Sequence, residues 1–316
     1  MTFLALLTKE MRLRLRRERT IWIMVVYLLL MGLLGWLFLN TTGNNYTTVN
    51  GPGLSEVGTN LYAILSQVQL FLIVFITPSL TATAINGEKE RQTYDMLLCS
   101  RLSSCSMVLG KLSAGMLNIL LLIAASLPLF SLVFFFGGVS PTQVASALLI
   151  YVVTALWIAT VSLFCSTLFS RPAISTTTAY IISMGWMLLP FLLALILLSS
   201  ANGSQLAQLY PDHSRLIFAW NPVVALVTTY PAGGQNSNPF FYMISLGYSS
   251  MTEHPPITLG NIQLSYWTAY VYICLLATGG FFLLTMLAIR PHQWLRRRRK
   301  PTSRTANKEV IMIQEG

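Results

Sequence analysis

Three of the ten acidic residues in this chain fall in one short polar segment between two long apolar runs. Residues 86–101 read NGEKERQTYDMLLCSR, and Glu88, Glu90 and Asp95 lie within eight residues of one another. On a helical wheel the segment has one polar face, made of Glu88, Gln92, Asp95 and Cys99. Its other face is made of Tyr94, Leu97 and Leu98. The pattern predicts either a short helix that docks a cytoplasmic partner or a solvated connector that turns the chain.

Side chains that could form a catalytic centre are poorly arranged. The candidates for a metal site are two pairs in one polar segment, Asp212 with His213 and Glu253 with His254. They combine hard and borderline ligands on irregular backbone, which disfavours a metal site. The sequence has no Gly-x-x-x-x-Gly-Lys-Ser/Thr phosphate loop, and its Gly110-Lys111 pair precedes an apolar run. We therefore expect no catalytic residue and no metal or cofactor bound by this chain.

The polar segments lie between long apolar runs that are expected to be helices. Of 316 residues, 54% are hydrophobic and only 9% are charged, whereas a soluble domain has roughly a quarter charged residues. Apolar runs of about 20 residues, the length that crosses a bilayer, separate the charges. The sequence predicts an all-α integral membrane protein with six spans, at about 21–39, 61–85, 112–136, 144–169, 173–199 and 266–289.

Basic residues indicate the orientation of these spans. Successive connections must alternate between the two sides of the membrane, and one side receives the N-terminal segment, the loop 86–111, the turn 170–172 and the tail 290–316. Those segments hold every Lys and Arg except Arg215. By the positive-inside rule we expect both termini in the cytoplasm of a multi-pass protein of the plasma membrane, which in bacteria is the inner membrane. The expected spans contain no Asp, Glu, Lys or Arg, which argues against an ion-coupled antiporter.

Two further segments have a membrane-related pattern. In residues 1–20, Leu4, Leu7, Met11 and Leu15 form an apolar stripe, whereas Arg12 and Arg16 lie away from it, which predicts an interfacial amphipathic helix. The net charge of +10 indicates attraction to anionic lipids rather than nucleic-acid binding. Within the outside loop 200–265, residues 216–227 are apolar except for Asn221, are broken by Pro222 and are too short to span, so a re-entrant element is expected if it packs against protein. The rest of this loop is predicted to be irregular.

The polar segment resembles a family signature. Residues 87–98, GEKERQTYDMLL, followed by Gly110-Lys111 ahead of the next span, resemble the cytoplasmic signature of type-2 ABC-transporter permeases. Gln92 stands where the family commonly has Gly, and Arg101 stands near its usual Pro. The wider plan is also similar, with an interfacial N-terminal helix, six spans and a re-entrant segment before the sixth.

The resemblance implies a permease subunit of an ATP-driven exporter. Two permease subunits, identical or related, would form the translocation path and pair with two separate ATPase subunits, which bind the ATP and Mg²⁺. A cytoplasmic coupling helix around 88–100, between spans two and three, would dock in the ATPase. Its implied coupling residues are Glu88, Glu90, Arg91, Gln92, Thr93 and Asp95. Its implied anchor to the membrane domain is Tyr94, Leu97 and Leu98.

Two alternatives belong to other functional classes. A non-transporting membrane scaffold would recruit a cytoplasmic protein through the same loop helix. An intramembrane enzyme would use the outside loop 200–265 as its site. A co-purifying ATPase separates the exporter from the scaffold, and a metal assay tests the enzyme.

Overall fold

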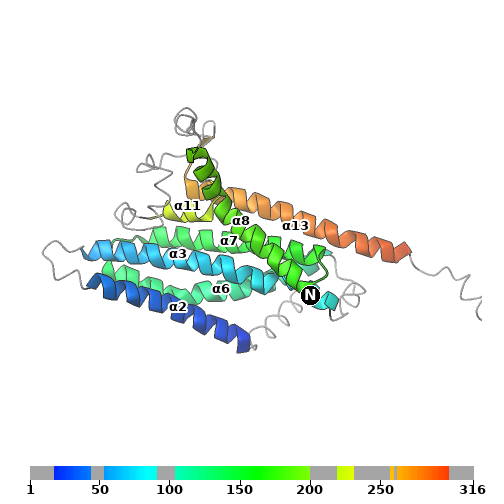
Figure 1. The fold of residues 1–316 in the computed structure, drawn as a ribbon, viewed down its shortest axis with the longest axis horizontal. Helices are drawn as coiled ribbons and strands as arrows, with labels where there is room; N and C mark the ends of the chain where they lie inside the picture. Colours follow the sequence, from blue (N-terminus) through cyan, green and yellow to red (C-terminus); the bar gives the residue numbers. More distant parts are fainter. Residues whose placement is uncertain are drawn as a thin grey trace, which may run out of the picture.

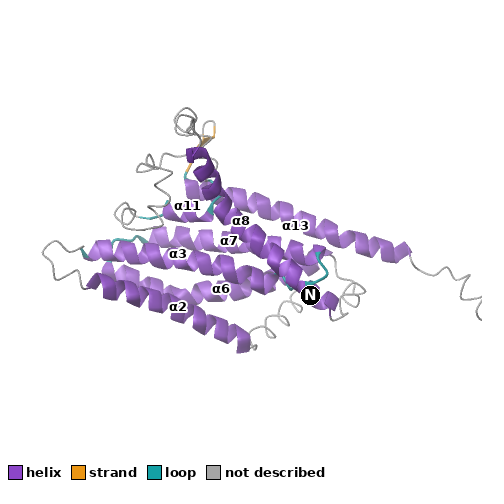
Figure 2. Cartoon of the chain, viewed as in Figure 1, coloured by secondary structure: helices purple, strands orange, loops and turns teal. Residues whose placement is uncertain are grey.

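Six long helices dominate the part of the protein described by the computed structural model (Figure 1). The described residues are 18–43, 53–90, 104–199, 219–230, 257–259 and 262–298. The long helices are α2 (Glu18–Gly43), α3 (Leu54–Thr81), α6 (Ser104–Phe136), α7 (Pro141–Leu168), α8 (Pro172–Ser199) and α13 (Tyr266–Arg298). Figure 2 also shows two short helices and a hairpin, which are α4 (Asn86–Glu90), α11 (Pro222–Val227), β1 (Ile257–Leu259) and β2 (Ile262–Leu264).

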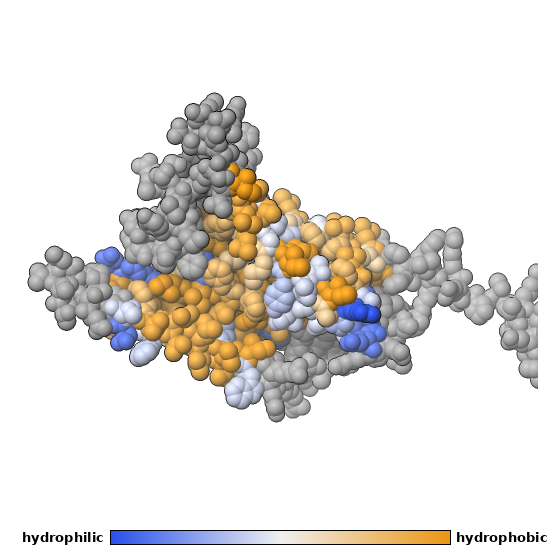
Figure 3. Space-filling view, viewed as in Figure 1, coloured by the Kyte–Doolittle hydropathy of each residue, from blue (hydrophilic) through white to orange (hydrophobic). Residues whose placement is uncertain are grey.

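All six long helices are long and apolar enough to cross a membrane. Each overlaps one of the six expected spans, so the prediction of six apolar spans is confirmed for these helices. Large apolar side chains such as Trp22, Phe135 and Leu276 are exposed. Figure 3 shows this apolar surface between hydrophilic residues at the two ends of the bundle. Such a surface is expected where lipid, rather than water, surrounds the helices.

Helix α7 is the centre of the bundle. It packs against α3, α6, α8, α11 and α13, whereas α2 lies at the edge on α3 and α6. The buried residues of α7 include Ala155, Ala159 and Ser162, and such small side chains let neighbouring helix backbones approach closely in a membrane. The central helix therefore contacts most of the other described helices and can hold them in a fixed arrangement.

The helices alternate in direction, so their ends form two groups (Figure 1). At the end that we call the α4 end, α3 turns into α4, α6 begins, and α7 gives way to α8. At the opposite end, the turn between α6 and α7 packs against the start of α3. There Gly137 and Gly138 have φ of +82° and +84°, and a Cβ on Gly138 would lie 2.3 Å from the Ser55 carbonyl oxygen. Both positions favour glycine because of their positive φ, and at Gly138 there is in addition no space for a side chain.

Helix α6 extends beyond the expected third span and contains an ionisable residue. Helix α6 begins at Ser104, earlier than the expected span 112–136, and therefore includes Lys111. The Lys111 side chain is buried. The apolar run begins only after this lysine, so the sequence predicted a shorter helix. The helix extends to Ser104 because the lysine ammonium is hydrogen-bonded inside the protein.

The described part of the expected outside loop contains a short helix and a hairpin. Helix α11 begins at Pro222 after Asn221, whose side chain accepts a hydrogen bond from the Val223 N–H, a regular helix start. All six residues of α11 are buried, as a re-entrant element requires. The prediction of irregular structure is wrong for the antiparallel pair β1 and β2, in which Ile257 pairs with Leu264.

Candidate functional site at the corner between α3 and α6

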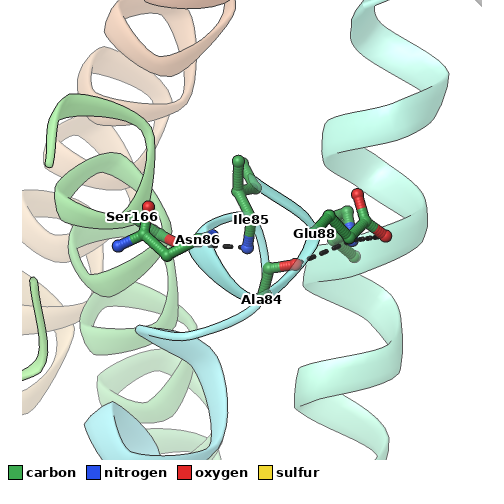
Figure 4. Close-up of polar contacts among 6 residues, drawn as sticks. Ala84, Ile85, Asn86, Glu88 and Ser166 are labelled. Carbon is green, nitrogen blue, oxygen red and sulfur yellow. Dashed lines mark hydrogen bonds and ion pairs between the residues drawn. The ribbon is translucent and has the colours of Figure 1, made fainter. Parts of the chain in front are cut away.

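A tight corner connects α3 to the polar segment singled out in the sequence (Figure 4). After Thr81 the chain turns, and α4 begins at Asn86. The backbone N–H of Gly87 donates to the Thr83 carbonyl at 3.0 Å, so the turn and the helix form one continuous unit. The buried residues of this unit include Ile85 and Asn86, so this part of the corner packs against the neighbouring helices.

Lys111 of α6 connects the corner to the neighbouring helix. Its Nζ donates to the carbonyl oxygen of Ala84 at 2.8 Å and to Oε1 of Glu88 at 2.6 Å. The side chains of Lys111 and Glu88 are 7% and 26% exposed. A buried ammonium is costly unless it is paired and hydrogen-bonded, and this one has a carboxylate and a carbonyl.

Helices α7 and α8 hold the other side of the corner. Ser166 Oγ, near the end of α7, accepts hydrogen bonds from the backbone N–H groups of Ile85 at 3.0 Å and Asn86 at 3.1 Å (Figure 4). These N–H groups precede the first full turn of α4, where the helix itself offers no acceptor. Lys89 Nζ also donates to the Thr167 carbonyl at 2.7 Å, and Ser175 Oγ of α8 donates to the Ala82 carbonyl at 3.0 Å.

Close packing of α3 on α6 supports these polar contacts. A Cβ built on Gly115 of α6 would lie 2.6 Å from Cγ2 of Thr81, the last residue of α3. Only glycine therefore permits this approach of the two helices. Gly115 lies one turn beyond Lys111, so the close approach brings the lysine within reach of the corner.

A second polar cluster lies where α3, α7 and the end of α11 meet. Ser66 Oγ donates to Tyr230 Oη at 2.7 Å, and Tyr151 Oη donates to the Ser66 carbonyl at 2.9 Å. Tyr230 Oη in turn donates to Gln67 Oε1 at 3.2 Å. All four residues are buried. In an apolar bundle such satisfied hydroxyl contacts fix the relative positions of the segments that carry them.

Two of the residues expected from the sequence lie in the described corner. Glu88 contacts Lys111, and Glu90 is exposed at the end of α4. The remaining expected coupling and anchor residues lie outside the described residues, namely Arg91, Gln92, Thr93, Tyr94, Asp95, Leu97 and Leu98. The expected interfacial residues also lie outside them, namely Leu4, Leu7, Met11, Arg12, Leu15 and Arg16. So do both His residues and both acids of the disfavoured metal site, Asp212, His213, Glu253 and His254.

Sequence reasoning did not predict the partners of Glu88. Lys111 follows it by 23 positions in the sequence, and Ser166, which holds the same corner, is 80 positions from Asn86. Helical periodicity relates only residues that are a few positions apart, so it could not predict these contacts. The available signal was the position of Lys111 itself, since a lone lysine beside an apolar run needs a carboxylate nearby.

The family comparison covers the helices from α3 onward and most of α13. The model of the ABC-2 family transporter protein matches residues 43–290. The chain belongs to the ABC-2 transporter family. A search of curated proteins found no match to the chain. The resemblance to type-2 ABC-transporter permeases is thereby confirmed, and the match includes the α3–α6 corner, the second polar cluster and α11.

Membership of the ABC-2 family decides the broad class of the protein. It is a multi-pass membrane subunit of a transporter rather than a catalytic enzyme. The scaffold alternative gains no support from the match. For an ABC-2 family protein, the corner between α3 and α6 is the candidate functional site, because it joins three long helices to the polar signature that begins within it.

Proposed function

We propose that this ABC-2 family protein is the permease subunit of an ATP-driven exporter. Two such subunits, identical or related, form the translocation path, and a separate ATPase binds ATP and Mg²⁺ and drives it. The observation that carries this proposal is the attachment of the α3–α4 corner to α6, α7 and α8. A displacement of the segment that follows Glu90 would reach all three helices through contacts of known geometry.

The proposed orientation puts the α4 end in the cytoplasm. Lys89, Lys111 and Arg171 all belong to this end, and the basic segments 1–20 and 290–316 attach to helix ends on the same side. A cytoplasmic excess of Lys and Arg is the general rule for membrane proteins. We place the protein in the plasma membrane, with both termini inside and with the N-terminal interfacial helix and the basic tail against anionic lipid headgroups.

The proposed docking surface is the coupling helix that continues from α4. Because Glu88 faces Lys111, its carboxylate serves the contact with α6, and we assign the contact with the ATPase to the residues beyond it. Asp95 and Gln92 lie on the expected polar face. Tyr94, Leu97 and Leu98 on the opposite face anchor the helix to the membrane domain.

Reversal of one charge tests this docking surface. Asp95→Lys changes the middle of the proposed face and is preferable to a change at Glu88, where a new ammonium would meet Lys111. We propose that Asp95 meets polar or basic groups of the ATPase. We therefore expect the amount of ATPase that co-purifies with the permease to fall by about tenfold or more, since a like charge in an interface costs over about 1.4 kcal/mol. Quantitative mass spectrometry of the purified complex measures this ratio.

The matched control is Glu56→Lys. Glu56 is exposed in the first turn of α3, at the opposite end of the bundle, and receives the same change of charge. Its ATPase recovery should equal that of the unaltered protein. Full ATPase recovery and unchanged ATP hydrolysis in the Asp95→Lys variant would remove the docking face from the proposal.

A further inference from the structure

Contacts with other elements help to set the position of helix α4. Its described part is Asn86–Glu90. Its polar contacts include those with Ser166 and Thr167 on α7 and with Lys111 on α6.

The contact with α6 differs from the others in chemistry. Ser166 accepts from the backbone at the start of α4, and the Thr167 carbonyl accepts from Lys89. Lys111 instead forms a charge-assisted pair with the Glu88 side chain and also binds the Ala84 carbonyl ahead of α4. Hydrogen bonds between two charged groups are roughly twice as strong as neutral ones. The Lys111 ammonium thus binds one group before Asn86, the first residue of α4, and one group after it.

We propose that Lys111 is a positioning residue that fixes α4 to α6 and passes displacements of the coupling segment into the membrane helices. This inference rests on the proposed function, because it assigns a route to the coupling between ATPase and spans. Lys111 contacts neither cargo nor nucleotide in this account. It acts through Glu88 and the Ala84 carbonyl, which move with α4.

The position of Lys111 within α6 makes it suited to this role. It is buried two turns from the start of the helix, one turn before Gly115 packs on Thr81. A displacement of Glu88 would therefore act on α6 one turn from a place where α6 packs closely on α3. Because closely packed helices transmit displacement, we expect α6 and α3 to move together.

Four variants test the assignment. Lys111→Met keeps the length and apolar stem of the side chain but removes its donors. The double variant Lys111→Met with Glu88→Gln also neutralises the carboxylate that Lys111 contacts, in case the single variant fails to fold. Lys111→Arg keeps a charged donor and is the conservative rescue. Ser113→Ala is the matched control, since the Ser113 hydroxyl bonds the Gly110 carbonyl within α6 itself.

Two readouts separate this inference from the proposed function. The first is the distance distribution between spin labels on Gly87→Cys in α4 and Leu109→Cys in α6, with Cys99 and Cys105 replaced by Ala, measured on the permease without ATPase. Gly87 has open space at its Cβ, and Leu109 is exposed, so both positions accept a label. The second is the rate of ATP hydrolysis by the assembled complex in lipid nanodiscs.

In Lys111→Met and in the double variant, we expect the label distribution to broaden and hydrolysis by the complex to change by about fivefold or more, the lower range of typical couplings between sites. ATPase recovery should stay at the unaltered level, because the docking face is intact. Lys111→Arg and Ser113→Ala should match the unaltered protein in both readouts.

Other outcomes overturn the inference. If Lys111→Met leaves the label distances unchanged, Lys111 does not position α4. If the distances broaden while hydrolysis stays the same, the contact is only structural and the coupling role is wrong. If no ATPase co-purifies with any variant or with the unaltered protein, the proposed function fails, and the label distances alone still decide whether Lys111 holds α4.

Discussion

A buried lysine in α6 contacts the corner between α3 and α4. The helix is apolar along most of its length, yet Lys111 is buried in it. The ammonium is tolerated because Glu88 and the Ala84 carbonyl satisfy it. The sequence drew attention to the acidic segment and to Lys111 separately but did not predict that Glu88 pairs with Lys111. The two residues meet only because the chain turns between α3 and α4.

The glycine turn at the opposite end carries a prediction for a single residue. Gly138 has positive φ, and a Cβ there would meet the Ser55 carbonyl at 2.3 Å. Gly138→Ala should therefore lower the free energy of unfolding by about 2 kcal/mol or more, from backbone strain and displacement of α3. Thermal unfolding in mild detergent measures this. Gly185→Ala in α8, where a Cβ meets nothing within 4 Å, should not lower the melting temperature, and an equally stable Gly138→Ala variant would contradict the explanation.

Individual helices could be predicted where the signal lies within the helix's own residues. The six apolar runs predicted six helices because each run is long enough to cross a bilayer by itself. Asn221 followed by Pro222 indicates a helix start, which the structure has in α11. The hairpin was missed, although Gly260-Asn261 between two short alternating runs is a turn signal that periodicity alone overlooks. The packing of α11 against α3, α7 and α13 depends on distant residues and could not be predicted.

The attachment of α11 to α3 carries a prediction for this element. Tyr230→Phe removes the hydroxyl that bonds Ser66 and Gln67 and leaves the buried Gln67 amide without this partner. We expect the free energy of unfolding to fall by about 1–3 kcal/mol, the usual cost of an unsatisfied buried polar group. The melting temperature in detergent measures this. Tyr272→Phe, on an exposed tyrosine of α13, is the control, and an unchanged melting temperature for Tyr230→Phe would show that the hydroxyl contacts contribute nothing.

At the scale of the whole molecule, the two ends of the bundle differ in chemistry. The α4 end combines basic residues with the corner that joins α3, α4, α6, α7 and α8, whereas the opposite end has the glycine turn at the start of α3. Membership of the ABC-2 family makes the protein a membrane subunit of a transporter. On our proposal the α4 end receives an ATPase in the cytoplasm, and the contacts at the corner carry its movement into the spans.

The most direct test of this account is purification of the protein from its native host in mild detergent, followed by quantitative mass spectrometry of the proteins that accompany it. We expect an ATPase subunit in near-equal amount, because the coupling segment would hold it against the α4 end. Absence of any ATPase, under conditions that preserve other membrane complexes from the same host, would contradict the exporter proposal and leave the corner without its assigned role.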